Sequence, residues 1–175
     1  MFSRAGRASL FDKTPFTEAF FDSNAAADGA LLVSFSAAVA YLLQVFLSEI
    51  RAFSLFGLLQ AVIAGVISWL ILGFATWFTA TRLFDSMGRP QTMLGLQGLA
   101  ALPLMFEGLI PLSGVGEIAA AVALVWYLAI LVVATREASD LTTRNAAVSV
   151  LIGFAAAVLI RAIIDVPFAI IGSLF

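Results

Sequence analysis

Long apolar runs separated by short polar stretches dominate the chain. The charge-free windows are Gly29–Ser48, Ala52–Thr81, Pro90–Phe106, Ile118–Thr135 and Asn145–Ile160. A helix that crosses about 30 Å of hydrocarbon needs roughly 20 apolar residues, and each window reaches or approaches that length. The pattern therefore predicts an all-α membrane bundle of five transmembrane helices. The predicted spans are 29–48, 57–80, 93–112, 117–135 and 145–164.

Turn-forming residues separate these windows. Gly88 and Pro90 interrupt the chain between the second and third spans, and Pro111 and Gly114 do so between the third and fourth. The last two spans are divided by a mainly polar stretch of ten residues, Arg136 to Asn145. Here we expect the chain to leave the bilayer and to re-enter it directly.

The sequence allows two kinds of local interaction in this polar turn, ion pairing and helix capping. Asp140 lies four residues from both Arg136 and Arg144, a spacing at which charges pair if the helices project beyond the bilayer. The alternative is a solvated loop in which these charges have no partner. Thr142 or Thr143 can cap the last helix.

The segment 1–28 mixes charged residues with phenylalanines. It lacks the basic start and continuous apolar core of a cleavable signal peptide, so we expect a retained, non-translocated segment. Within residues 9–27, Thr14 can cap a helix that begins at Pro15. Phe16 and Phe20 then share one face, with Glu18 and Asp22 on another. This predicts a short amphipathic helix at the membrane interface, the alternative being an irregular tail. Residues 166–175 form a short apolar tail.

Basic residues are unequally distributed between the two predicted sides of the membrane. One side carries Arg4, Arg7, Lys13, Arg82, Arg89, Arg136 and Arg144, and the other carries Arg51 and Arg161. Because cytoplasmic loops are enriched in Lys and Arg, we expect a cytoplasmic N-terminus and an extracytoplasmic C-terminus, in the cell membrane if the chain is prokaryotic. The expected contact residues of the two cytoplasmic turns are Arg82, Asp85, Arg89, Arg136, Asp140 and Arg144.

Composition supports a lipid environment and offers little chemistry. The chain is 62% hydrophobic and 11% charged, whereas soluble domains carry about 25% charge. Cys and His are absent, which excludes disulfides, thiolate nucleophiles and histidine ligands to a metal or haem. We find no zinc-protease, nucleophile-elbow or phosphate-loop motif, so the sequence predicts no enzyme, cofactor or metal site. The charges are too few for a nucleic-acid surface.

Four charged residues converge on the predicted outer leaflet. Glu107 lies near the outer end of the third span, Glu117 begins the fourth, and Arg161 lies near the outer end of the fifth. An ionised group in hydrocarbon needs a partner or water, so we expect Arg161 to pair with Glu107 or Glu117, with Asp165 as a local competitor. Separate snorkelling of each group to water is the alternative.

Small residues mark positions where helices can approach closely. Gly65 and Gly73 in the second span and Gly153 in the fifth are expected at helix contacts, within one subunit in preference to a dimer. Pro103 should kink the third span. Trp126 lies too centrally for an interfacial anchor, so we expect it to pack between helices.

Three segments together resemble the Yip domain family of five-helix membrane proteins, named in eukaryotes for interaction with Ypt/Rab GTPases. These segments are WFTATRLFDSMGRPQT (77–92), GLQGLAALPLMFEGLIPL (95–112) and AAAVALVWYLAILVVATREASDLTTRNAAV (119–148). The likeness covers about residues 10–165 and is similar to the short prokaryotic members. It implies a five-span domain over 29–165 and transfers no catalytic or ligand residue.

These observations favour a non-enzymatic membrane protein that acts as a scaffold, organising a membrane complex or membrane shape. The expected partners are the lipid bilayer and other membrane proteins or further copies of the chain. The alternative is a small transporter or channel component with Glu107, Glu117 and Arg161 near its route.

Overall fold

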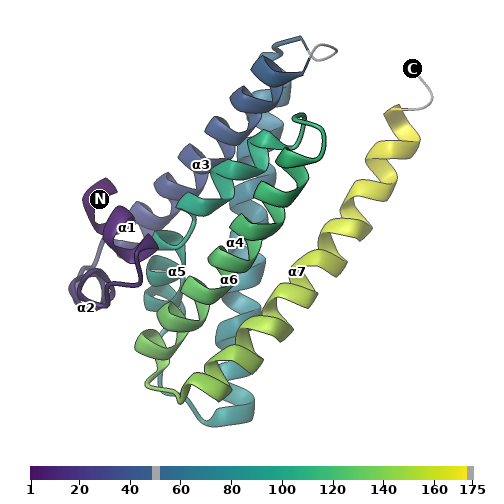
Figure 1. The fold of residues 1–175 in the computed structure, drawn as a ribbon. Helices are drawn as coiled ribbons and strands as arrows, with labels where there is room; N and C mark the ends of the chain where they lie inside the picture. The colour runs from purple at the N-terminus through teal and green to yellow at the C-terminus, as the bar shows by residue number, and fades with distance from the viewer. Residues whose placement is uncertain (49–51, 173–175) are drawn as a thin grey trace.

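The computed structural model describes residues 1–48 and 52–172, apart from the side chains of Arg161 and of 164–172. Within this part of the chain every element is a helix (Figure 1). The long helices are α3 (Ala25–Leu47), α4 (Leu55–Phe84), α6 (Val115–Ser139) and α7 (Thr143–Gly172). The shorter ones are α1 (Phe2–Ser9), α2 (Thr14–Phe20), α5 (Pro90–Leu99) and the 3₁₀ helix η1 (Leu102–Leu109).

The four long helices are long and apolar enough to cross a membrane. The fifth candidate span is the pair α5 and η1, which meet at an angle of 49°. Pro103 lies in the first turn of η1, where it lacks the N–H that would continue the ladder of α5. The all-α membrane bundle predicted from the sequence is thus confirmed.

All four long helices are longer than the predicted spans, and α7 exceeds its span by the most. α4 begins at Leu55 and ends at Phe84, and its 30 residues extend about 45 Å, against a hydrocarbon core of about 30 Å. α7 continues to Gly172, past the expected limit at residue 164. α7 therefore includes residues 166–172 of the expected tail.

Glycines allow the closest helix crossings. A Cβ atom on Gly98 of α5 would lie 2.2 Å from the Cα atom of Gly29 in α3. A Cβ atom on Gly153 of α7 would lie 2.2 Å from the Thr76 hydroxyl of α4. Backbones approach at these points because no side chain separates them, as is typical of helix contacts in membranes. α3, α5 and α6 bury the core, whose largest members include Leu32, Met93, Leu96, Ile130 and Leu131.

One face of α4 presents large apolar side chains outward. Phe56, Ile63, Ile67, Phe74 and Phe78 are all exposed and recur at intervals of seven and four residues, which places them on one side of the helix. An uninterrupted apolar face of this length is stable in contact with lipid and unstable in water. The protein is therefore an integral membrane protein in contact with the bilayer.

The N-terminal segment forms a two-helix hairpin, in which α2 is the short helix expected within 9–27 and α1 precedes it (Figure 1). Thr14 is not the cap; the Asp12 carboxylate accepts hydrogen bonds from its amide and hydroxyl, at 2.9 and 2.8 Å. Phe16 is completely buried, whereas Phe20 is 45% exposed. The two rings were expected to lie on one exposed face. Phe16 is instead inside the protein and only Phe20 is exposed, because the hairpin packs on the helix bundle.

Candidate functional site

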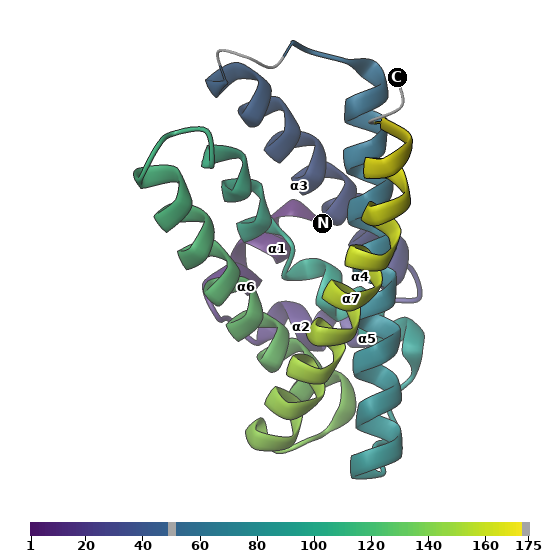
Figure 2. The same cartoon turned by 90° about the vertical axis from the view of Figure 1, so that its right-hand side faces the viewer.

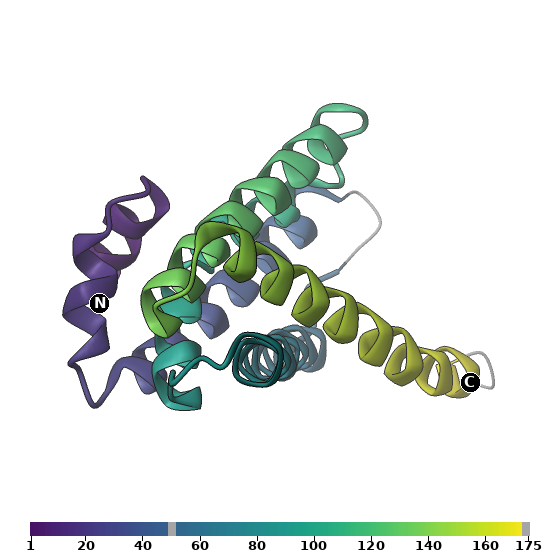
Figure 3. The same cartoon turned by 90° about the horizontal axis from the view of Figure 1, so that it is seen from below.

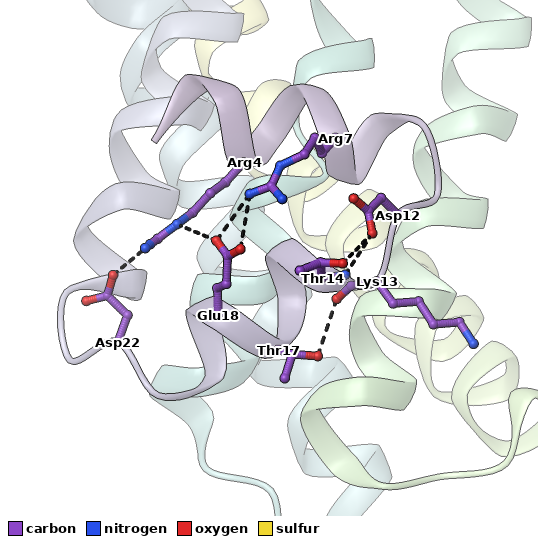
Figure 4. A network of polar contacts seen from close by, with 8 residues as sticks. All are labelled: Arg4, Arg7, Asp12, Lys13, Thr14, Thr17, Glu18 and Asp22. Carbon is purple, nitrogen blue, oxygen red and sulfur yellow. Dashed lines mark hydrogen bonds and ion pairs between the residues drawn. The ribbon is translucent and has the colours of Figure 1, made fainter.

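Ion pairs hold the two helices of the N-terminal hairpin together (Figure 4). Arg4 of α1 donates to Asp22 at 2.8 Å and to Glu18 of α2 at 3.1 Å. Arg7 donates to the same Glu18 at 3.2 Å. The hydrogen bond from Arg4, with a further one from the Asn24 amide, lowers the pKa of Asp22 below its usual value. This network fixes α2 relative to α1 by bonds that span 11 to 18 residues.

The hairpin is also anchored to the bundle. The Trp126 indole N–H of α6 donates to the carbonyl oxygen of Ser9 at 2.8 Å, and its ring stacks on Phe106 of η1. Ala5 and Ala8 of α1 are completely buried. Trp126, expected to pack between helices, therefore links the bundle to the N-terminal hairpin, and α2 contacts both α5 and α6.

A second tryptophan fixes the connection between α4 and α5. The Trp77 indole N–H donates to the carbonyl oxygen of Gly88 at 2.8 Å. The Ser86 hydroxyl donates to the carbonyl oxygen of Ser139 at 3.1 Å, and accepts from the Gly88 amide at 3.1 Å. A Cβ atom on Gly88 would lie 2.9 Å from the Ala138 carbonyl oxygen, so this loop lies directly against the end of α6.

Aspartates terminate both α4 and α6. Asp85 and Asp140 are the C-cap residues and adopt the left-handed conformation, each with φ of 50°. The left-handed conformation is one that Asp tolerates better than most residues, although Gly and Asn are more usual there. The two helices thus end in similar caps, and each cap carries a carboxylate.

α2, the α4–α5 loop and the α6–α7 turn together enclose a groove of about 940 Å³. We call it the end groove. Figures 1 and 2 show that the two connections lie at the same end of the bundle. The lining residues of α2 and its C-cap are Phe16, Thr17, Phe20 and Phe21. Those near the α4–α5 loop are Phe84, Asp85, Ser86, Met87, Gly88, Arg89 and Thr92, and those of α6 and its turn are Glu137, Ala138, Ser139, Asp140 and Leu141.

Several large apolar side chains at the end groove are highly exposed. Phe20 is 45% exposed, Phe21 is 82% exposed and Met87 is 98% exposed. Ser139 is 5% exposed, and its hydroxyl oxygen has no hydrogen-bond partner among the described residues. Exposed aromatic and methionine side chains beside a groove are typical of protein contact surfaces.

Three of the six predicted turn residues line this groove, namely Asp85, Arg89 and Asp140. Arg82 lies over the ring of Phe78, with 5.7 Å between the guanidinium carbon and the ring centre. Arg136 pairs with Glu137 at 2.6 Å. Arg136 thus pairs with Glu137 and not with Asp140, four residues away. Asp140 is the left-handed C-cap of α6, so the helical spacing that would bring it to Arg136 ends before it. Arg144 also lies outside the lining. The Thr142 hydroxyl caps α7 by accepting from the Asn145 amide at 3.4 Å.

A second cavity, of about 310 Å³, lies within the bundle between α3, α4, η1, α6 and α7. Glu107 lines it together with Gln44 and Tyr127. Figures 2 and 3 show α7 diverging from α6 toward its C-terminal end, on this side of the bundle. The cavity brings Glu107 close to two uncharged polar side chains of neighbouring helices.

The predicted outer-leaflet cluster is only partly described. Glu117 lies exposed in the first turn of α6, and Glu107 lines the cavity. The side chains of Arg161 and Asp165 lie outside the described residues, so the predicted ion pair stays a prediction. The predicted packing glycines face other helices of the same chain: Cβ atoms on Gly65 and Gly73 would meet Ala37 of α3 and Leu94 of α5.

The fold and its apolar surface define a multi-pass integral membrane protein without a metal-binding cluster of His, Cys, Asp or Glu among the described residues. Residues 9–164 match the Yip1 domain family, so the chain belongs to that family, as its sequence predicts. The chain matches no curated protein and no solved structure.

Neither helix α1 nor the N-terminal network of ion pairs was expected from the sequence. The signal was present in FSRAGRAS, where Arg4 and Arg7, like Ala5 and Ala8, are three residues apart and so share a helix face. The bonds from Trp77 and Trp126 had no local signal, since each joins a side chain to a distant backbone carbonyl.

Proposed function

We propose that the protein is a non-enzymatic membrane scaffold that binds a partner protein at the end groove. The observation that carries this proposal is the groove itself, which three segments far apart in the sequence enclose. Its exposed phenylalanines and methionine offer apolar contact area beside the groove. Hydrogen bonds from Ser86 and Trp77 already hold the loop in place, so binding costs little conformational entropy there.

The groove belongs to the arginine-rich side of the membrane. Arg82, Arg89, Arg136 and Arg144 all lie in or beside its two connections. By the preference of cytoplasmic loops for basic residues, we assign this end, with the N-terminus, to the cytoplasm and the C-terminus to the opposite side. The partner is therefore a cytoplasmic segment of another membrane protein or of a second copy of this chain.

Site-specific photocrosslinking tests the proposal. A photoreactive amino acid replaces Met87, which lines the groove and is 98% exposed. Ile118 is the matched control, since it is 68% exposed near the opposite end of α6. We expect a discrete protein adduct in native membranes at position 87 and none at position 118, with loss of the adduct in a Phe21→Asp background. Lipid adducts alone, or equal protein adducts at both positions, would contradict the proposal.

The cavity lined by Glu107 favours a second candidate function, a small transporter or channel component. An acidic side chain beside Gln44 and Tyr127 within a membrane bundle is the kind of group that marks ion pathways. Glu107→Gln separates the two functions. A scaffold keeps its adduct at position 87 and loses stability at most, whereas a transporter loses solute flux in reconstituted liposomes.

A further inference from the structure

Charge is segregated at the arginine-rich end of the bundle. Three carboxylates line the end groove, those of Asp85, Glu137 and Asp140, against the single guanidinium of Arg89. The other arginines of these two connections, Arg82, Arg136 and Arg144, lie outside the lining. A surface that is basic by count is therefore acidic within the groove, although Arg136 offsets part of the charge of Glu137.

Helix ends reinforce the negative potential of the groove. Asp85 and Asp140 occupy the C-caps of α4 and α6, where the helix dipole places partial negative charge. A carboxylate at that position is repelled by its own helix, so each cap is less stable than it would be with Asn or Gly. A cation bound in the groove removes this repulsion for two helices at once.

The volume and apolar lining of the groove are compatible with a bound helix. A helix with its side chains is about 10 Å wide and rises 5.4 Å per turn, so 940 Å³ accommodates roughly two turns. Phe20 and Phe21 provide aromatic contacts, and Met87 adapts to irregular apolar shapes. An amphipathic helix places apolar side chains at intervals of three and four residues on such a surface.

We propose that the end groove binds an amphipathic helix of a partner protein, with its apolar face on Phe20, Phe21 and Met87 and its Lys or Arg side chains on Asp85 and Asp140. This inference rests on the proposed scaffold function and specifies the chemistry of its partner. A lipid phosphate is repelled by the same carboxylates, which distinguishes the groove from an anionic-lipid site.

Peptide binding to the purified full chain tests the inference. The protein is reconstituted in nanodiscs of neutral lipid and titrated with a fluorescent peptide of about five helical turns, with leucines on one face and lysines beside them. A peptide with glutamate in place of lysine is the charge control. We expect saturable binding of the lysine peptide that weakens with added salt, and no saturable binding of the glutamate peptide.

Asn substitutions isolate the carboxylates. Asp85→Asn and Asp140→Asn keep a residue that tolerates the left-handed conformation, so we expect an unchanged or higher Tm. Affinity for the lysine peptide should fall about threefold to fivefold for each carboxylate removed. Glu117→Gln, which removes one exposed charge at the opposite end of α6, should leave affinity unchanged.

The outcomes separate the inference from the function on which it rests. Equal binding of the two peptides, or unchanged affinity in the double Asn variant, overturns the basic-helix inference. If the lysine peptide fails to bind while a protein adduct still forms at position 87, the scaffold function stands and its partner has other chemistry. If both the peptide and the adduct are absent, both proposals are wrong.

Discussion

At the residue scale, single atoms decide how closely the helices approach. Gly98 and Gly29 bring the backbones of α5 and α3 into direct contact, and a Cβ atom on Gly98 would lie 2.2 Å from the Gly29 Cα atom. The atom that obstructs it belongs to the backbone, so no side-chain rotation can relieve the overlap. This crossing is therefore intolerant of any larger residue.

Gly98→Val should destabilise the protein by about 1–3 kcal/mol or more, because α3 and α5 must separate to admit the side chain. Thermal unfolding in mild detergent measures the effect. Gly6→Ala is the control, since nothing lies within 4 Å of the added methyl group and alanine favours the helix. If Gly98→Val unfolded at the same temperature as Gly6→Ala, the described crossing would be wrong.

The pH response of the hairpin follows from Asp22. Its pKa is lowered from 3.8 by the hydrogen bond from Arg4, so the folded state favours the charged carboxylate. The resulting stabilisation is present above pH 3.8 and is lost as the pH falls through the lowered pKa. We expect the fluorescence of Trp126 to stay constant between about pH 5 and 8 and to change only in more acidic solution. Asp22→Asn should reduce that acidic transition, and the remainder should come from Asp12, whose pKa is lowered by the hydrogen bonds from Thr14.

At the element scale, two tryptophans attach two different segments to the bundle. Trp126 of α6 bonds to Ser9 at the end of α1, and Trp77 of α4 bonds to Gly88 in the α4–α5 loop. Each bond joins an indole N–H to a backbone carbonyl. Each segment should therefore respond to the loss of its own tryptophan and not to the loss of the other.

Phenylalanine substitution of each tryptophan tests this independence. Trp126→Phe should increase amide hydrogen exchange in residues 2–9, and Trp77→Phe should increase it in residues 85–89, each through the loss of a bond worth about 1 kcal/mol. The two variants serve as controls for each other. Equal exchange changes in both segments for either variant would indicate global loosening and contradict separate attachment.

The elements themselves were largely predictable from the sequence, whereas the site was predictable only in part. Uncharged runs set the long helices because hydrocarbon admits only backbone that bonds within its own segment. Pro103 indicated the break in the third span for a local reason, its missing N–H. The end groove depends on bonds such as Ser86 to Ser139, which join residues 53 apart and leave no periodic pattern. The turns predicted its acidic residues Asp85 and Asp140 but not that Phe20 and Phe21 would face them.

At the scale of the whole molecule, membrane orientation determines which surface a partner can reach. The end groove serves a cytoplasmic partner only if the α4–α5 loop and the α6–α7 turn lie on the cytoplasmic side, with the turn after η1 on the other. The chain has no native Cys, so single cysteines report each position without background.

We expect Met87→Cys and Thr142→Cys to react with a membrane-impermeant thiol reagent only when the cytoplasmic face is open, and Ser113→Cys to react from outside in intact cells. The positive-inside rule gives the expected direction. Detergent-solubilised protein provides the control for intrinsic reactivity. Labelling of positions 87 and 142 from opposite faces would contradict both the topology and the end groove as a single cytoplasmic surface.

The bend between α5 and η1 also constrains how the protein is made. Neither half is long enough to cross a bilayer: the ten residues of α5 extend about 15 Å, half the hydrocarbon thickness. Its partner α3 is synthesised earlier, but η1 also packs against α6, which emerges from the ribosome later. We therefore expect the broken span to reach its final packing only after α6 has been synthesised, so that its insertion depends on helices on both sides of it in the sequence.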